Sequence, residues 1–127
     1  MLDPSRRYTI LEHHRDGVHW DFLVEDGPAL RTWAVDALIV AGVDLPARAL
    51  APHRRLYLDY EGPIAGGRGD VRRWDRGRAW VEEWTDRAVR LRVEGAQLVG
   101  MVDLRELPGA ADADGPRPWR FRLGKLS

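Results

Sequence analysis

The chain has 127 residues, with 20 basic and 20 acidic side chains and a formal net charge of zero. This balance excludes a global electrostatic attraction to nucleic acid, so a nucleic-acid site would have to be a local patch. The absence of cysteine excludes disulfides, thiolate metal sites and a cysteine nucleophile, and it fits a cytoplasmic protein. Because 44% of the residues are hydrophobic and 31% charged, we expect one globular domain over residues 1–127. No segment is apolar enough to span a membrane or to serve as a signal peptide, and we expect no membrane partner.

Short alternating segments dominate the first half of the chain. They predict strands at 8–12, 18–25 and 29–35, separated by turns at Arg15-Asp16-Gly17 and Asp26-Gly27-Pro28. From 36 to 52 the pattern loosens, and Gly42, Pro46 and Pro52 predict a long loop with room for one short helical turn. Alternation resumes at 55–60 and predicts another strand, followed by a glycine-rich loop at 62–69.

Strand-like segments recur at short intervals through the second half. They predict strands at 71–74, 79–84, 88–93, 97–104 and 119–123, with turns at 75–77, 85–86 and 94–95. The Ala/Asp/Gly/Pro-rich segment at 108–118 predicts an exposed loop. About nine short strands without a sustained helical period predict an all-β fold with little helix, either an antiparallel barrel or a sandwich.

Three of the four histidines lie in the segment 13–25. Strand alternation places His19 and Asp21 on one face, with Cα atoms about 6.5–7 Å apart. An Asp16-Gly17 turn would fold His13 back opposite His19, since Asp-Gly tolerates the positive φ of a tight hairpin. Two imidazoles and a carboxylate suit a divalent metal such as manganese, zinc or iron. The alternative is a polar strand with a hydrogen-bonded histidine.

The fourth histidine lies in the predicted strand region around 53–60. His53 and Tyr57 are an even number of residues apart, so they face the same side if the strand starts early. With neighbouring arginines they would form a phosphate pocket, with donors for the oxygens and a group able to protonate a leaving oxygen. The alternative is a rim histidine beside a packed tyrosine.

Several motifs occur in a characteristic order. His-x5-His-Trp-Asp-Phe spans 13–22, Thr-Trp-Ala-Val spans 32–35, His-x3-Tyr spans 53–57 and Asp-Tyr-Glu-Gly spans 59–62. Trp-Asp-Arg-Gly follows at 74–77, then a Gly-containing hairpin at 93–100 and a Trp-bearing segment at 119–123. Over nearly the whole chain this order resembles the 3′-phosphoesterase domain at the N-terminus of bacterial ATP-dependent DNA ligase D.

The resemblance implies a small closed or nearly closed antiparallel β-barrel with a crescent-shaped groove. It implies manganese-dependent trimming of nucleic-acid 3′ ends in DNA repair by non-homologous end joining, first of a terminal ribonucleoside and then of the 3′-phosphate. By position, His13, His19 and Asp21 match the metal ligands, with Mn²⁺ expected ahead of Zn²⁺ or another divalent metal. His53 and Tyr57 match residues that hold the scissile phosphate, the histidine being a candidate general acid. The expected partners are 3′ ends of primer-template DNA and a separate DNA ligase or end-joining protein.

This chain departs from the family pattern at two phosphate-binding positions. Leu23 stands where the family has an arginine, and Asp36-Ala37 stands where a lysine is expected. The candidates for phosphate or nucleic-acid binding are therefore other arginines: Arg31, Arg48, Arg54, Arg68 and Arg72.

These departures leave two other functions open. One is a catalytically weakened or inactive relative that binds nucleic-acid ends or a repair partner. The other is a non-haem iron enzyme, because His19, Asp21 and the remote His53 have the 2-His-1-carboxylate form.

Overall fold

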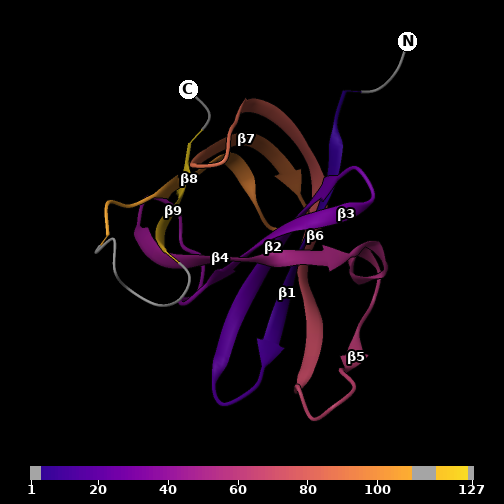
Figure 1. Ribbon diagram of the computed structural model, residues 1–127. Helices are drawn as coiled ribbons and strands as arrows, with labels where there is room; N and C mark the ends of the chain where they lie inside the picture. The colour runs from indigo at the N-terminus through magenta and orange to yellow at the C-terminus, as the bar shows by residue number, and fades with distance from the viewer. Residues whose placement is uncertain (1–3, 110–116, 126–127) are drawn as a thin grey trace.

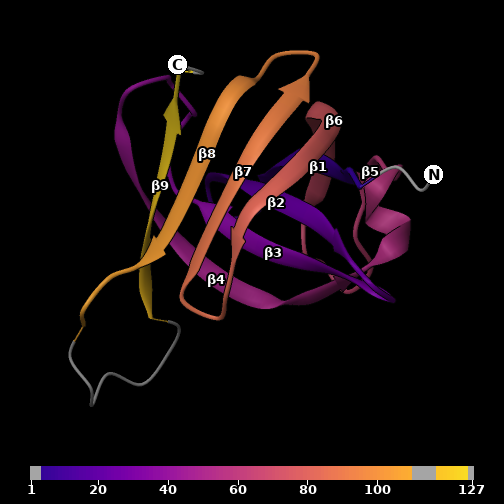
Figure 2. The same cartoon turned by 90° about the horizontal axis from the view of Figure 1, so that it is seen from above.

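Antiparallel strands form a closed barrel in the computed structural model, which describes residues 4–109 and 117–125 (Figures 1 and 2). The strand order is β1-β2-β3-β4-β9-β8-β7-β6, and β6 closes the barrel by pairing with β1. The short strand β5 lies outside, paired only with β6. The elements are β1 (Arg6–His14), β2 (Val18–Asp26), β3 (Ala29–Val35), β4 (Asp44–Arg54), a 3-10 helix (Arg55–Leu58), β5 (Gly62–Pro63), β6 (Asp70–Trp84), β7 (Ala88–Gly95), β8 (Val99–Glu106) and β9 (Pro118–Gly124). The predicted all-β barrel is confirmed.

The barrel wall is buried on both faces near one end. Inside, aromatic rings pack at the centre, with Phe22 5.9 Å from Phe121 and Trp33 5.8 Å from Trp119 between ring centroids. Outside, a second apolar cluster is formed by Leu11, Leu23, Leu30, Leu58 and Val71. Because successive side chains of a strand point to opposite faces, Phe22 enters the interior and its neighbour Leu23 enters the outer cluster. Leu58 thereby anchors the 3-10 helix against the outside of the barrel.

The long loop predicted for residues 36–52 is wrong in its second half, where β4 begins at Asp44. Pro52 lies at a register shift between β4 and β3, and the pairing of β4 with β9 ends at Arg48. A proline there costs little, because an irregular or edge position does not need its missing N–H. The sequence predicts a loop here because of Pro46 and Pro52, yet both prolines lie within β4.

The strand predicted for residues 55–60 is also wrong. Arg55–Leu58 is a 3-10 helix, and only Leu58 of its residues is buried, while Leu56 is 45% exposed. One apolar anchor is what a single turn of helix needs, whereas a strand buries every second side chain. His53 at the end of β4 and Tyr57 in the helix therefore do not share a strand face.

The turn predicted at 75–77 lies inside one continuous strand, β6, which replaces the two predicted strands 71–74 and 79–84. Asp75 is 2% exposed and accepts hydrogen bonds from the Tyr8 hydroxyl at 2.8 Å and from the backbone N–H groups of Gln97 and Leu98 at 2.8 and 3.1 Å. Gly77 is needed for close packing, because a Cβ there would lie 2.0 Å from the Glu94 carbonyl oxygen. Asp and Gly thus serve strand packing here rather than chain reversal.

The tight turns at 15–17 and 27–28 lie where the sequence predicts them. The predicted loop at 108–118 includes residues 110–116, which lie outside the described residues. No helix in the described part of the chain is long and apolar enough to cross a membrane.

Candidate metal centre

The β1–β2 hairpin brings two histidines together. Asp16 and Gly17 adopt positive φ angles of 51° and 114°, which an Asp-Gly turn tolerates. The hairpin pairs His13 directly with His19 in the strand register. The geometry expected from the turn is therefore present.

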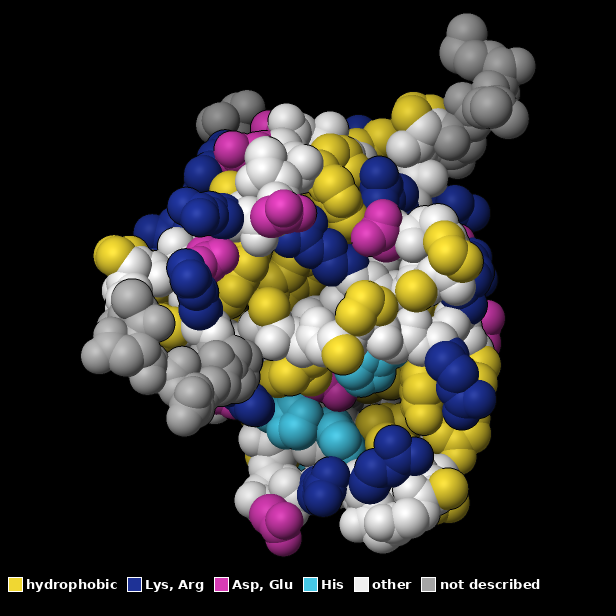
Figure 3. Space-filling view, viewed as in Figure 1, with side chains coloured by type: hydrophobic (Ala, Val, Ile, Leu, Met, Phe, Trp, Pro, Cys, Tyr) yellow, Lys and Arg dark blue, Asp and Glu magenta, His cyan; other side chains and the backbone are white. Residues whose placement is uncertain are grey.

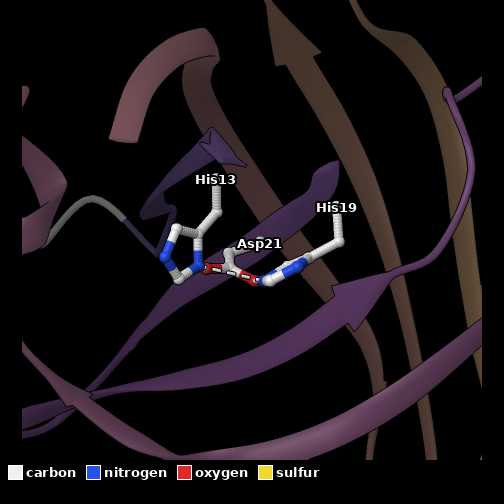
Figure 4. A group of neighbouring side chains, drawn as sticks. All are labelled: His13, His19 and Asp21. Carbon is white, nitrogen blue, oxygen red and sulfur yellow. Dashed lines mark hydrogen bonds and ion pairs between the residues drawn. The ribbon is translucent and has the colours of Figure 1, made fainter. Parts of the chain in front are cut away.

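Three side chains converge on one point beside this hairpin (Figure 4). His13 Nδ1 lies 3.0 Å from His19 Nε2, His19 Nε2 lies 3.0 Å from Asp21 Oδ1, and His13 Nδ1 lies 3.4 Å from Asp21 Oδ2. In the described chain this is the group of His, Asp and Glu side chains that could hold a metal ion. Asp21 is 4% exposed, so its carboxylate is part of the barrel wall rather than a solvated surface charge.

The separations fit a divalent metal. Ligand atoms about 2.1 Å from one ion lie about 3.0 Å apart at right angles and about 3.4 Å apart at tetrahedral angles. Asp21 Oδ1 is buried and has no hydrogen-bond partner among the described residues, although His19 Nε2 is within 3.0 Å. His13, His19 and Asp21 each bring one ligand atom to within 4.8 Å of the other two, as a shared metal ion requires.

A backbone carbonyl fixes the orientation of His13. Its Nε2 lies 2.8 Å from the Arg68 carbonyl oxygen, so Nε2–H donates and Nδ1 faces Asp21 and His19. The glycine-rich loop reaches this position because Gly69, at φ 82°, packs on β1, where a Cβ would lie 2.0 Å from the His14 carbonyl oxygen. The loop therefore supports the metal centre from outside the barrel.

The electrostatics keep Asp21 ionised. Burial by itself raises the pKa of the Asp21 carboxyl, but the neighbouring imidazoles of His13 and His19 outweigh it and hold that pKa below its ordinary value. The hydrogen bond to Asp21 raises the pKa of His13 above its ordinary value, and burial opposes that rise only in part. At neutral pH the Asp21 side chain is therefore a carboxylate, the form that can bind a cation.

A pocket of about 440 Å³ opens beside the three side chains. Figure 3 shows cyan histidine side chains gathered around this hollow with dark-blue cationic side chains at its border. The pocket is lined by Leu11, His13, Arg15, Asp21, Ala51, Pro52, His53, Arg54, Tyr57, Ile64, Arg68 and Val71. The predicted metal ligands His13 and Asp21 and the predicted phosphate-binding residues His53 and Tyr57 thus line one cavity.

His53 and Tyr57 contact each other although they come from different elements. Their ring centroids are 5.8 Å apart at an interplanar angle of 69°. His53 Nδ1 lies 2.9 Å from the Ala51 carbonyl oxygen and donates to it, so Nε2 is the ring atom left for proton transfer.

The predicted arginines divide into two groups. Arg54 and Arg68 line the pocket. Arg31 does not: its guanidinium lies 5.0 Å from the Trp84 ring centroid and donates to the Thr85 carbonyl oxygen.

Two further arginines lie outside the pocket lining. Arg48 pairs with Asp36 at 3.0 Å, and Arg72 lies 3.8 Å from Asp70 in a separate shallow depression. Leu23 is fully buried in the outer cluster. The guanidinium groups that border the pocket therefore come from other segments than β2.

Sequence reasoning missed Arg15. It lies in the hairpin turn, is exposed, and lines the pocket together with Arg54 and Arg68. The signal was its place between the two histidines, because a turn that aligns His13 with His19 also holds its own side chains near them.

Comparison with known proteins agrees with the site. The model of the DNA Ligase D 3′-phosphoesterase domain family matches residues 11–105. The chain is similar to the "Multifunctional non-homologous end joining protein LigD" of Pseudomonas aeruginosa, at 37% identity over 80 residues, which is 59% of this chain. The match covers 9% of that relative, so the chain corresponds to a small part of it. This chain belongs to the DNA ligase D 3′-phosphoesterase domain family.

Proposed function

We propose that this protein is a metal-dependent phosphoesterase that trims 3′ ends of nucleic acid, removing a 3′-phosphate or a 3′-ribonucleoside during DNA end joining. The observation that carries the proposal is the convergence of His13, His19 and Asp21, because His13 and Asp21 line a cavity that is also lined by His53 and Tyr57. The family of the chain supports phosphoester hydrolysis as the chemistry.

A divalent cation at the three ligands would supply Lewis-acid polarisation of the phosphoryl oxygens. His53, when protonated on both ring nitrogens, would give the Nε2 proton to the leaving oxygen, since Nδ1–H already donates to the Ala51 carbonyl oxygen. The Tyr57 hydroxyl would donate to a non-bridging phosphoryl oxygen, and Arg54 and Arg68, which line the same pocket, would bind anionic groups of the nucleic acid.

We propose Mn²⁺ as the metal, which the resemblance to the family implies; two imidazoles and one carboxylate suit manganese and also zinc. The proposed substrate is the 3′ end of primer-template DNA in the cytoplasm, with a separate ligase or end-joining protein as the partner that consumes the trimmed end. The identity of the relative supports this setting.

The test is Mn²⁺-dependent release of inorganic phosphate from a primer-template carrying a 3′-phosphate. We expect His19→Ala and His53→Ala each to lower release by at least about 100-fold, as losses of a metal ligand and of a proton donor do. Arg87→Gln is the matched control, because Arg87 is exposed and lies outside the pocket lining.

A wild-type chain that binds Mn²⁺ and DNA but releases no phosphate would overturn the proposal. It would favour the alternative, a binding module for nucleic-acid ends. The burial of Leu23 at the position of a family arginine is the observation that favours this alternative.

A further inference from the structure

Ion pairs neutralise most arginines of this chain, but not those around the pocket. Carboxylates lie within 4.0 Å of arginines across the barrel surface, as in Arg7–Asp59, Arg92–Glu94 and Arg122–Asp44. Arg15, Arg54 and Arg68 are all exposed, and within the described ranges no carboxylate pairs with any of the three. Three guanidinium groups, none with a carboxylate partner among the described residues, therefore border one opening.

The pocket holds one carboxylate against these three guanidinium groups. That carboxylate is Asp21, and it faces His13 and His19. The three arginines come from three separate segments, namely the β1–β2 turn, the end of β4 and the glycine-rich loop. The buried residues Leu11, Asp21 and Val71 form the floor of the pocket, so the exposed arginines stand at its mouth.

A terminal phosphate at the floor carries at most two negative charges and would be bound by a cation held at the metal ligands and by His53 and Tyr57. Arginines spread around the mouth are placed instead for anionic groups that stay outside. A polynucleotide strand offers such groups, because a phosphodiester recurs at every nucleotide.

We propose that Arg15, Arg54 and Arg68 form an arginine rim that binds the internal phosphodiesters of the strand whose 3′ end enters the pocket. The rim makes the ligand a polynucleotide rather than a mononucleotide, and it assigns a binding role to Arg15. The inference rests on the proposed function for the position of the 3′ end. The side chain at position 23 cannot contact phosphate, because Leu23 is buried among apolar side chains. The three rim arginines are exposed and would make the phosphate contacts instead.

Salt dependence measures the rim directly. Each phosphate neutralised on a single strand contributes about −0.7 to the slope of log affinity against log salt concentration, so three contacts give about −2. Each substitution of a rim arginine by glutamine should reduce the slope by about 0.7 and weaken binding at low salt by about tenfold. Arg68→Gln keeps the backbone carbonyl that orients His13, so it tests the guanidinium alone.

The experiment is fluorescence anisotropy of the full chain with a labelled single-stranded oligonucleotide of about twelve nucleotides ending in a 3′-hydroxyl, in EDTA and over a salt series. The variants are Arg15→Gln, Arg54→Gln and Arg68→Gln, with Arg87→Gln as the matched control. In the phosphate-release assay, Arg15→Gln should raise KM for the oligonucleotide more than it lowers kcat.

The outcomes separate the rim from the proposed activity. A reduced slope in the three rim variants, with Arg87→Gln like wild type, supports the rim even where no phosphate is released with Mn²⁺. Slopes equal to wild type in all variants overturn the rim even where the wild type releases phosphate. Binding of inorganic phosphate as tightly as the oligonucleotide would also overturn it, because the rim requires several phosphates on one strand.

Discussion

Gly69→Ala should loosen the metal centre without touching a metal ligand. Gly69 adopts φ 82°, and an added Cβ would meet the His14 carbonyl oxygen at 2.0 Å and Arg15 Cβ at 2.9 Å. Real Cβ atoms essentially never come closer than 3.0 Å, so the loop must move by about 1 Å, the difference between 3.0 and 2.0 Å. That movement stretches the 2.8 Å hydrogen bond between the Arg68 carbonyl oxygen and His13 Nε2.

The magnitude follows from two separate costs. Placing alanine in the left-handed region costs about 1–2 kcal/mol of folding free energy. Losing the acceptor that orients a metal-binding histidine typically costs about 10–100-fold in metal affinity. Gly67→Ala is the matched control, because Gly67 has φ 68° but an added Cβ would meet no atom within 4 Å. Gly67→Ala should therefore lower the folding stability but leave the metal affinity unchanged.

Isothermal titration of Mn²⁺ into wild type, Gly67→Ala and Gly69→Ala measures the effect, and thermal melts measure the shared backbone cost. We expect both variants to melt at a lower temperature and only Gly69→Ala to bind Mn²⁺ at least about tenfold more weakly. Equal Mn²⁺ affinity in the two variants would refute the claim that the loop carbonyl supports His13.

Three further predictions concern the barrel around the site. Asp75→Ala should lower the free energy of unfolding by about 3 kcal/mol, because three donors, two of them buried, lose their acceptor, and Tyr8→Phe should lower it by about 1 kcal/mol; urea titrations check both. Burial raises the pKa of Glu25, but the Arg7 backbone N–H and the Arg55 guanidinium outweigh it and hold that pKa below its ordinary 4.5. Its contribution is present above pH 4.5 and is lost as pH falls through the lower folded value, so the wild type should melt above Glu25→Gln at pH 7 and lose that advantage in acid. Leu23→Arg should destabilise the chain by at least about 3 kcal/mol in urea, because an unpaired guanidinium would enter an apolar cluster.

Local patterns predicted the hairpin that carries the site. An Asp-Gly pair between alternating segments is a turn signal that depends on neighbouring residues alone, so the opposition of His13 and His19 follows from the sequence. The strands β1, β2, β3 and β9 were predicted for the same reason. Their alternating apolar residues need no knowledge of distant partners.

The secondary-structure predictions were wrong where contacts between residues far apart in the sequence determine the local structure. Asp75 and Gly77 are turn residues by propensity, but Tyr8 and the β7–β8 turn supply partners that keep them in a strand. Pro52 favours a loop by propensity, but β4 has no β9 partner at that position, so the missing N–H of the proline breaks no hydrogen bond there. The sequence alone does not show where that pairing ends. The contact between His53 and Tyr57 was predicted from the wrong element, since a bend into a 3-10 helix brings the rings together.

The outer cluster explains why an anion would be bound from the rim rather than from position 23. Leu23 follows Asp21 on the same strand face, so a cation there would point toward the pocket floor. Its neighbours Leu11, Leu30, Leu58 and Val71 offer no polar partner, and an ionised group buried among them is strongly destabilising. The same cluster seats Leu58 and with it the 3-10 helix that carries Tyr57. An arginine at position 23 would therefore displace the helix that completes the pocket. A guanidinium contact to phosphate is therefore compatible with this packing from the exposed rim and not from position 23.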